Sequence, residues 1–253
     1  MISKHQYEIR LDLAEKTLRQ KFGLSPSASI TTAIVLGTGW GDSLKTDSPA
    51  SVDLTEFPGG KELEVIEGHK RRIEIGTIGG KKVLILRGRV HMNETTFNPD
   101  IAVFVRMQIE VLIQLGVKNF ILTCGAGGLI PETVPGTIVF IDSFMSSDNE
   151  VMPLFPGEFY SPEEVLDQEW IFNVMRQEQD PEHHTSGAYV FWRGPHIEGI
   201  KNDKDNMSDR GGVAVGMSIK PECCVVAKYP GVRVLALAHI MNSSKEVLDH
   251  TEH

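Results

Sequence analysis

The stretch from residue 119 to residue 129 constrains the fold more than any other part of the chain. Residues 120–122 are an apolar run typical of a buried strand, and the run stops at Thr123. Glycines follow at positions 125, 127 and 128. Backbone amides in a glycine turn can bind an anion because no side chain obstructs them. The alternative interpretation is a tight connection between a strand and a loop that binds nothing.

The size and charge of the chain limit what such a fold can do. Its 253 residues, 41% of them hydrophobic, are enough for a single α/β domain spanning residues 1–253. A net charge of −9 argues against binding to nucleic acid or to an anionic membrane. No apolar run is long enough to cross a bilayer, and the first residues lack an apolar signal core. We therefore expect a cytoplasmic protein.

Neither the cysteines nor the paired histidines indicate a metal site. Cys124, Cys223 and Cys224 are odd in number and two of them are adjacent, which fits neither a disulfide framework nor a zinc pattern. His183 and His184 lie in a polar segment, where histidines usually face solvent. We expect reduced thiols and no bound metal.

Apolar periodicity predicts helices and strands that alternate along the chain. Helices are expected at residues 8–22, 98–115, 167–178 and 221–227. Strands are expected at residues 31–36, 136–141, 188–192, 213–215 and 232–240, with a hairpin formed by residues 72–78 and 82–86. The polar segment 201–212 is expected to be mobile or disordered. Residues 145–163 are expected to form a long loop, either a lid or a surface connection.

A second glycine motif, Gly-Thr-Gly-Trp-Gly at residues 37–41, follows the strand predicted at 31–36. It contributes a hydroxyl at Thr38. It lacks the Gly-x-Gly-x-x-Gly spacing and no Gly-Lys-Ser/Thr follows, so neither a dinucleotide fingerprint nor a P-loop is indicated.

Arg89 and His91 come directly after the second strand of the hairpin. Because they are two residues apart, an extended backbone would point both side chains to one side. A guanidinium beside an imidazole is suited to phosphate. The alternative is that both belong to a solvated strand end.

Six polar or glycine elements each follow a predicted strand: Thr38, Arg89, the Gly125 turn, Glu198, Ser218 and Asn242. In open α/β sheets, ligands bind beyond the carboxyl ends of the strands, so we expect these six at one sheet edge. Hydroxyls, an arginine and glycine amides suit an oxyanion, whereas a carboxylate and a carboxamide suit a heterocycle such as a purine. The alternative is that they are unrelated loop residues.

The chain resembles the trimeric purine nucleoside phosphorylases. The motifs that carry the resemblance occur in the family's order: residues 37–41, 88–91, 123–129, 194–198, 216–222 and Asn242. The resemblance implies a nucleoside phosphorylase fold, in which a central mixed and twisted sheet, partly barrel-like, is flanked by helices. It also implies a homotrimer with sites near the subunit interfaces.

The resemblance assigns roles to individual residues. It implies phosphate binding by Thr38, His69, Arg89, His91, the Gly125 backbone and Ser218. It implies nucleoside binding by Ala126, Ile197, Glu198, Met217 and Asn242, and catalytic roles for Glu198, Asn242 and His91. The implied reaction is phosphorolysis of a purine nucleoside to the free base and ribose 1-phosphate, in purine salvage. Phosphate is a co-substrate and no cofactor is implied. Asparagine at position 242 favours 6-oxopurines, because an amide can donate to an acceptor oxygen.

Several positions depart from the family's pattern. Cys124 replaces an asparagine, Asn93 a sugar-side tyrosine, Ile197 an aromatic beside the purine, and Met241 a threonine. The given sequence ends at His253, before the helix that carries the family's 5′-hydroxyl-binding histidine, so it resembles a C-terminally short and divergent member. Two hypotheses remain open. One is an active purine nucleoside phosphorylase, weak or altered in specificity, and the other is a degenerate paralogue that binds phosphate or purine with little or no catalysis.

Overall fold

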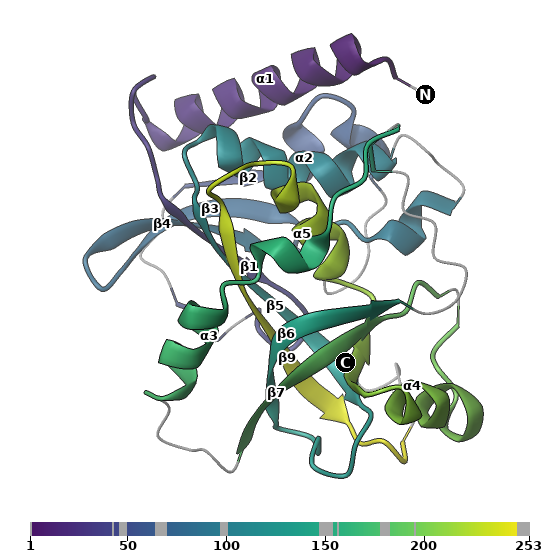
Figure 1. Cartoon of the computed structure of the whole chain (residues 1–253). Helices are drawn as coiled ribbons and strands as arrows, with labels where there is room; N and C mark the ends of the chain where they lie inside the picture. Colours follow the sequence, from purple (N-terminus) through teal and green to yellow (C-terminus); the bar gives the residue numbers. More distant parts are fainter. Residues whose placement is uncertain are drawn as a thin grey trace.

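The computed structural model describes residues 2–41, 43–45, 50–63, 70–96, 101–146, 154–155, 157–177, 183–194 and 196–246. Figure 1 shows a mixed sheet with helices around it. Its strands are β1 (Thr32–Leu36), β2 (Ser51–Asp53), β3 (Arg72–Ile78), β4 (Lys81–Arg87), β5 (Asn119–Gly128), β6 (Ile138–Ser146), β7 (His184–Phe191), β8 (Gly212–Gly216) and β9 (Arg233–Asn242). Its α-helices are α1 (Lys4–Phe22), α2 (Ile101–Gln114), α3 (Gln168–Met175), α4 (Asp205–Asp209) and α5 (Lys220–Ala227). Short helical turns are η1 (Leu54–Glu56), η2 (Gly60–Glu62), η3 (Met92–Thr96), η4 (Pro162–Val165) and the π-helical turn η6 (Ile200–Lys204).

Strand β5 organises the sheet. Within the described residues the strand order is β2-β3-β4-β1-β5-β8-β7-β6-β9, and β9 also pairs with β5. The strands β5, β8, β7, β6 and β9 therefore close on themselves, while β1 to β4 extend from β5 as an open sheet. A register shift at Ala126–Gly127 marks where β5 bends, as bulges do at barrel corners. The predicted mixed, partly barrel-like sheet is confirmed.

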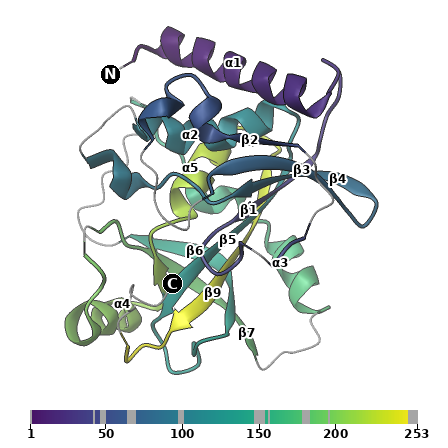
Figure 2. The same cartoon turned by 180° about the vertical axis from the view of Figure 1, so that it is seen from behind.

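Three helices form a layer over one end of the sheet. Helix α1 packs on α2, and α2 packs on α5; the two opposite views in Figures 1 and 2 show this order, with α1 outermost. Buried apolar residues of all three join the main core, which includes Leu18, Ile109 and Val225. The core-facing side of α1 consists of Tyr7, Leu11, Ala14 and Leu18. Ile9 and Leu13, which belong to the apolar pattern that predicted this helix, are exposed.

Helix α1 begins earlier than predicted. It starts at Lys4 rather than Glu8, because Ser3 and Gln6 form a capping box that satisfies the first backbone amides. It ends at Gly23 in the left-handed conformation, as predicted. The predicted start of the next helix at Asn98 lies outside the described residues, and α2 is described from Ile101.

The glycine run after Thr123 is strand and not a turn, which corrects the prediction. Strand β5 continues to Gly128 in extended conformation. The glycines do not reverse the chain but allow neighbouring residues to pack closely against β5. A Cβ on Gly125 would overlap Met241 Sδ, and one on Gly128 would overlap the Thr133 carbonyl. The sequence does not distinguish a glycine turn from a strand that contains glycines, because the difference lies in the residues that pack against the glycines.

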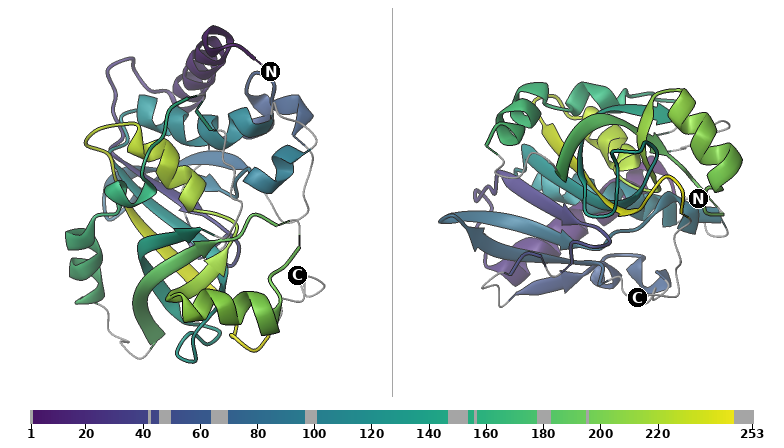
Figure 3. Two further views of the ribbon diagram at one scale, coloured as in Figure 1. Left: turned by 45° about the vertical axis from the view of Figure 1, so that its right-hand side comes forward. Right: turned by 90° about the horizontal axis from the view of Figure 1, so that it is seen from below.

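The prediction of disorder at residues 201–212 is also wrong. This segment forms η6 and α4, and it is held by buried Met207 and Lys204. Asp203 Oδ2 accepts a 2.8 Å hydrogen bond from the Gly199 amide. The polar composition indicated disorder, but the side chains of Asp203 and Lys204 form hydrogen bonds within the protein. Figures 1, 2 and 3 all show α4 beside the end of β9.

Candidate functional site

Strand ends meet at the middle of β5 from two directions. Strands β1, β4, β5 and β9 run parallel, whereas β8 is antiparallel to β5 and parallel to β7. The end of β1 approaches Thr123, whose hydroxyl accepts a 3.2 Å bond from the Gly37 amide. The end of β8 arrives from the other side, so that Gly216 lies against the Gly125 carbonyl. The prediction of one shared sheet edge is therefore wrong, but the segments that it grouped do converge.

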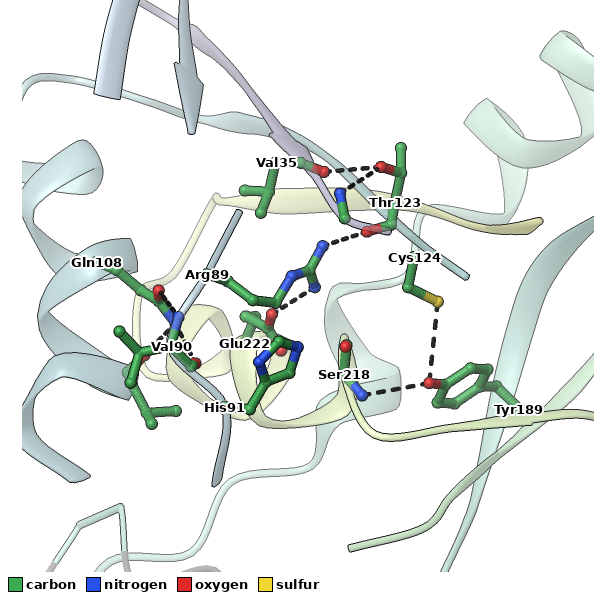
Figure 4. Close-up of polar contacts among 12 residues, drawn as sticks. Val35, Arg89, Val90, His91, Gln108, Thr123, Cys124, Tyr189, Ser218 and Glu222 are labelled. Carbon is green, nitrogen blue, oxygen red and sulfur yellow. Dashed lines mark hydrogen bonds and ion pairs between the residues drawn. The ribbon is translucent and has the colours of Figure 1, made fainter. Parts of the chain in front are cut away.

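Arg89 is at the centre of this convergence. Its side chain is only 1% exposed, and Nη1 donates a 2.6 Å hydrogen bond to Glu222 Oε1. Nη2 donates to the Thr123 carbonyl (Figure 4). Among the described residues Nε has no hydrogen-bond partner. The guanidinium charge is thus balanced by a carboxylate of α5, and the two bonds use two of its five N–H groups.

His91 is held by Glu94. Glu94 Oε1 accepts a 2.8 Å bond from the His91 amide and lies 3.3 Å from the ring Nδ1. Arg71 Nη2 lies 2.6 Å from Glu94 Oε2. Burial acts to raise the pKa of Glu94, but the bonds from His91 and the charge of Arg71 lower it. An ionised Glu94 favours a proton on Nδ1 and directs Nε2 away from the carboxylate.

Helix α2 positions the segment that carries Arg89 and His91. Gln108 Oε1 accepts from the Val90 amide at 2.8 Å, and Gln108 Nε2 donates to the Val90 carbonyl at 3.0 Å. Figure 4 shows Val90 on one side of the chain and both Arg89 and His91 on the other. The two-residue spacing therefore places the pair as predicted.

Ser218 precedes a strained turn at the start of α5. Ile219 has φ 68° and ψ −55°, and the Lys220 amide donates to the Ser218 carbonyl at 2.8 Å. This is a γ-turn of the rare form with positive φ. Its backbone strain is largest for a β-branched residue such as isoleucine. The buried Ser218 amide donates at 3.3 Å to the hydroxyl of Tyr189.

Cys124 takes part in the same polar group. Its thiol lies 3.9 Å from the Tyr189 hydroxyl, to which it donates a weak hydrogen bond. Burial raises the pKa of Cys124 to about 12, so the thiol is protonated at neutral pH. Cys124 is a packed, neutral donor and not a nucleophile.

Glu198 and Asn242 meet around Gly127, farther along β5. A Cβ on Gly127 would lie 2.8 Å from Glu198 Oε1 and 3.4 Å from Asn242 Oδ1. Both side chains are 6% exposed. Asn242 Nδ2 donates a 2.8 Å hydrogen bond to the Glu246 carbonyl. The structure thus brings the predicted carboxylate and carboxamide together, and Gly127 leaves the room that they need.

The other predicted site residues lie as follows. Ala126 is buried, and the Met217 sulfur accepts a 3.8 Å contact from Asn93 Nδ2. Thr38 is exposed, although its carbonyl faces the position that a Gly125 side chain would take, at 3.3 Å. Ile197 is half-buried. His69 lies outside the described residues.

Comparison with known proteins places this chain in a family. The family model described as "Phosphorylase superfamily" matches residues 31–253. The chain belongs to the phosphorylase superfamily. It is 28% identical over 251 residues to purine nucleoside phosphorylase 1 of Bacillus subtilis, covering 95% of this chain and 88% of that protein. It is also 28% identical over 236 residues to purine nucleoside phosphorylase of the rat, covering 86% and 77%.

Solved structures of phosphorylases share the fold. The structure of Schistosoma mansoni purine nucleoside phosphorylase in complex with inosine has a TM-score of 0.77 and 22% identity, covering 95% of this chain and 84% of that one. The structure of a Schistosoma purine nucleoside phosphorylase in complex with hypoxanthine has a TM-score of 0.75 and 20% identity, covering 95% of this chain and 88% of that one. The predicted nucleoside phosphorylase fold is confirmed.

Three side chains of this phosphorylase site were not predicted: Glu94, Lys204 and Glu222. Glu222 lies within the motif at residues 216–222, and Glu94 lies three residues after His91. Neither position indicates which residue is its partner. For Glu94 and Glu222 the available signal is a charge within four residues of a predicted ligand-binding residue, since buried charges need partners. Lys204 lies in the polar segment 201–212 and carries no such signal.

In the described part of this phosphorylase, no group of three His, Cys, Asp or Glu residues is placed to hold a metal ion. Among the same residues, no helix is both long enough and apolar enough to cross a membrane.

Proposed function

We propose that the protein catalyses phosphorolysis of purine nucleosides, giving the free base and ribose 1-phosphate. The observation that carries this proposal is the spacing along β5. The Arg89 guanidinium is bonded to the carbonyl of Thr123, whereas Glu198 and Asn242 flank Gly127. Four residue steps of β5 join the two points, which is at most about 13 Å of extended strand. An anion site and a purine site at that separation can hold phosphate and a nucleoside in contact.

In the proposed reaction the phosphate is bound by Arg89, His91, Ser218, Thr38 and the Gly125 backbone. The Nε–H of Arg89, for which the described residues offer no acceptor, supplies a donor, and the His91 imidazole lies on the same side of the chain. Phosphate then attacks the anomeric carbon as the bond to the base breaks, and the sugar passes through an oxocarbenium-like state. Held geometry contributes several kcal/mol to such a step.

Negative charge develops on the leaving purine, and Asn242 is proposed to donate to it. A donor aimed where charge appears lowers the barrier more than one aimed at the bound substrate. Glu198 is proposed to accept from the ring N–H of a 6-oxopurine, while Met217 and Ala126 pack against the sugar and Ile197 against the base. Inosine and hypoxanthine, which occur in complexes of Schistosoma purine nucleoside phosphorylases, are the first substrate and the first base to test. A role in purine salvage follows if they react, and we propose no cofactor beyond phosphate.

We further propose a homotrimer in the cytoplasm. Phe159 is 95% exposed and Phe172 is 59% exposed, which supports contact with another copy, since large exposed aromatics are typical of interfaces. The described cysteines are free thiols, which supports a reducing compartment. Light scattering coupled to size exclusion tests the trimer.

The alternative is a protein that binds phosphate or purine without turnover. The observation that favours it is the contact between Asn93 and Met217, where the family's sugar-side tyrosine would be expected. Release of hypoxanthine from inosine, followed by ultraviolet absorbance with and without phosphate, decides between the two. Phosphate-dependent release supports the enzyme. Hypoxanthine binding without release supports the alternative, and neither binding nor release contradicts both.

A further inference from the structure

Lys204 places a buried positive charge at the purine end of the site. Its residue exposure is 1%, which is unusual for a lysine unless the ammonium is paired. Nζ donates to the Ser243 carbonyl at 2.9 Å and to the Glu246 carbonyl at 2.7 Å. Both acceptors belong to the loop that follows β9. Lys204 therefore ties the π-helical turn η6 to the segment that begins with Asn242.

The charge of Lys204 also acts on Glu198. Burial lowers the pKa of Lys204, whereas the carboxylates of Glu198 and Glu246 act to raise it. The backbone also joins the two segments, because the Lys204 amide donates at 3.0 Å to the carbonyl of Gly199, the residue after Glu198. Glu198 is itself 6% exposed, so water screens this interaction little.

Asn242 is connected to the same ammonium through one shared acceptor. The Glu246 carbonyl accepts from Asn242 Nδ2 at 2.8 Å and from Lys204 Nζ at 2.7 Å. Both side chains that flank Gly127 are therefore tied to Lys204, one by charge and the other by a common oxygen. Figure 3 shows how the helical turns before β8 lie against the end of β9.

We propose that Lys204 is a positioning residue for the purine: its ammonium fixes the loop that orients the Asn242 amide and supplies the positive charge that acts on the Glu198 carboxylate. This inference rests on the proposed function, in which Glu198 and Asn242 bind the base. A buried carboxylate without a neighbouring cation is costly, so the site would lose its acceptor or open to water if the charge were removed. Base binding should then depend on Lys204 and phosphate binding should not, because the anion site lies four residue steps away along β5.

The test compares four variants by calorimetric titration of hypoxanthine and, separately, of inorganic phosphate. Lys204→Met removes both charge and donors, Lys204→Gln keeps N–H donors without charge, and Lys204→Arg keeps both. Lys201→Met removes an exposed lysine from the same turn and is the matched control. We expect hypoxanthine Kd to rise about 10- to 100-fold in Lys204→Met and Lys204→Gln, the range for a hydrogen bond to a charged group. We expect Lys204→Arg to restore most of the affinity, and all four phosphate Kd values to stay within about twofold of the parent.

The outcomes separate this inference from the proposed function. If the parent binds hypoxanthine and Lys204→Gln binds it equally well, the charge has no role and the inference is overturned. A parallel loss of phosphate and hypoxanthine affinity would indicate a merely structural lysine and would also overturn it. If Lys204→Met does not fold, the comparison of Lys204→Gln with Lys204→Arg carries the test. Failure of the parent to bind hypoxanthine at all overturns the proposed function, and the inference with it.

Discussion

The side chains of Arg89 and Glu222 form an ion pair 2.6 Å long in which they are 1% and 3% exposed. One follows the strand β4 and the other lies in the first turn of α5. This pair joins the open part of the sheet to the helix that follows β8. It also means that a phosphate at this site meets a guanidinium whose charge is already partly compensated.

Glu222→Gln should destabilise the protein and strengthen its attraction for anions. The substitution leaves a buried guanidinium without its counter-charge, and loss of one partner of such a pair costs about 3 kcal/mol. Urea denaturation with and without phosphate measures the effect. Phosphate should stabilise the variant more than the parent, because a ligand that binds the folded state more tightly raises the free energy of unfolding by a larger amount. Glu169→Gln, at an exposed first-turn position of α3, should change neither quantity.

Arg89→Ala should weaken phosphate binding by about 1.5–3 kcal/mol, the range for a hydrogen bond to a charged group. Hypoxanthine affinity should change little, because the purine site lies four residue steps farther along β5. Titration of both ligands to parent and variant measures this, and unchanged phosphate affinity would remove Arg89 from the anion site. Thermal unfolding must be followed in parallel, since Glu222 loses its partner.

Asn242→Asp should move base preference from 6-oxopurines toward 6-aminopurines. A carboxylate accepts from an exocyclic amine but cannot donate to an oxo group. The structure adds a cost: the new oxygen would face the Glu246 carbonyl, which now accepts from Asn242 Nδ2 at 2.8 Å. Affinities for hypoxanthine and adenine give the measurement. Their ratio should fall by about tenfold or more, and an unchanged ratio would show that Asn242 does not read the 6-position.

Acid should remove the contribution of Glu94 to stability. The pKa of this carboxyl lies below its usual value of 4.5 in the folded protein, because bonds from His91 and the charge of Arg71 outweigh burial. The ionised form therefore stabilises the fold above about pH 4.5, and this is lost as the pH falls through the lower folded value. Glu94→Gln should be less stable than the parent at pH 7, and the difference should shrink below pH 4. Glu132→Gln, at an exposed position, is the control for a general charge effect.

Local signals in the sequence were enough for much of the fold. The hairpin of β3 and β4 turns at Gly79 and Gly80, both with positive φ, as two-residue hairpin loops require. The two-residue spacing of Arg89 and His91 was also enough to predict that both side chains lie on one side of the chain. What could not be predicted depends on distant partners. Glu222 is 133 positions from Arg89, and the direction of β8 relative to β5 is set by pairing rather than by local composition.

The glycines of β5 show the same limit at the candidate site, and they lead to the last prediction. Gly127→Ala should abolish purine binding while leaving the fold and the phosphate site intact. The added Cβ would lie 2.8 Å from Glu198 Oε1, 3.3 Å from Val215 Cγ1 and 3.4 Å from Asn242 Oδ1. The closest of these is the far end of a side chain, which can move aside. The backbone at Gly127 has no positive φ, so alanine adds no strain of its own.

Two other glycines, at positions 128 and 41, supply the controls for this prediction. A Cβ on Gly128 would overlap the backbone carbonyl of Thr133, which cannot move alone, so Gly128→Ala should lower stability as well as binding. A Cβ on Gly41 would meet nothing within 4 Å, so Gly41→Ala should alter neither. Hypoxanthine and phosphate titrations, with urea denaturation of each variant, separate the cases. The alanine Cβ would displace the side chains of Glu198 and Asn242. If Gly127→Ala nevertheless binds hypoxanthine like the parent, these two residues do not hold the purine where β5 bends.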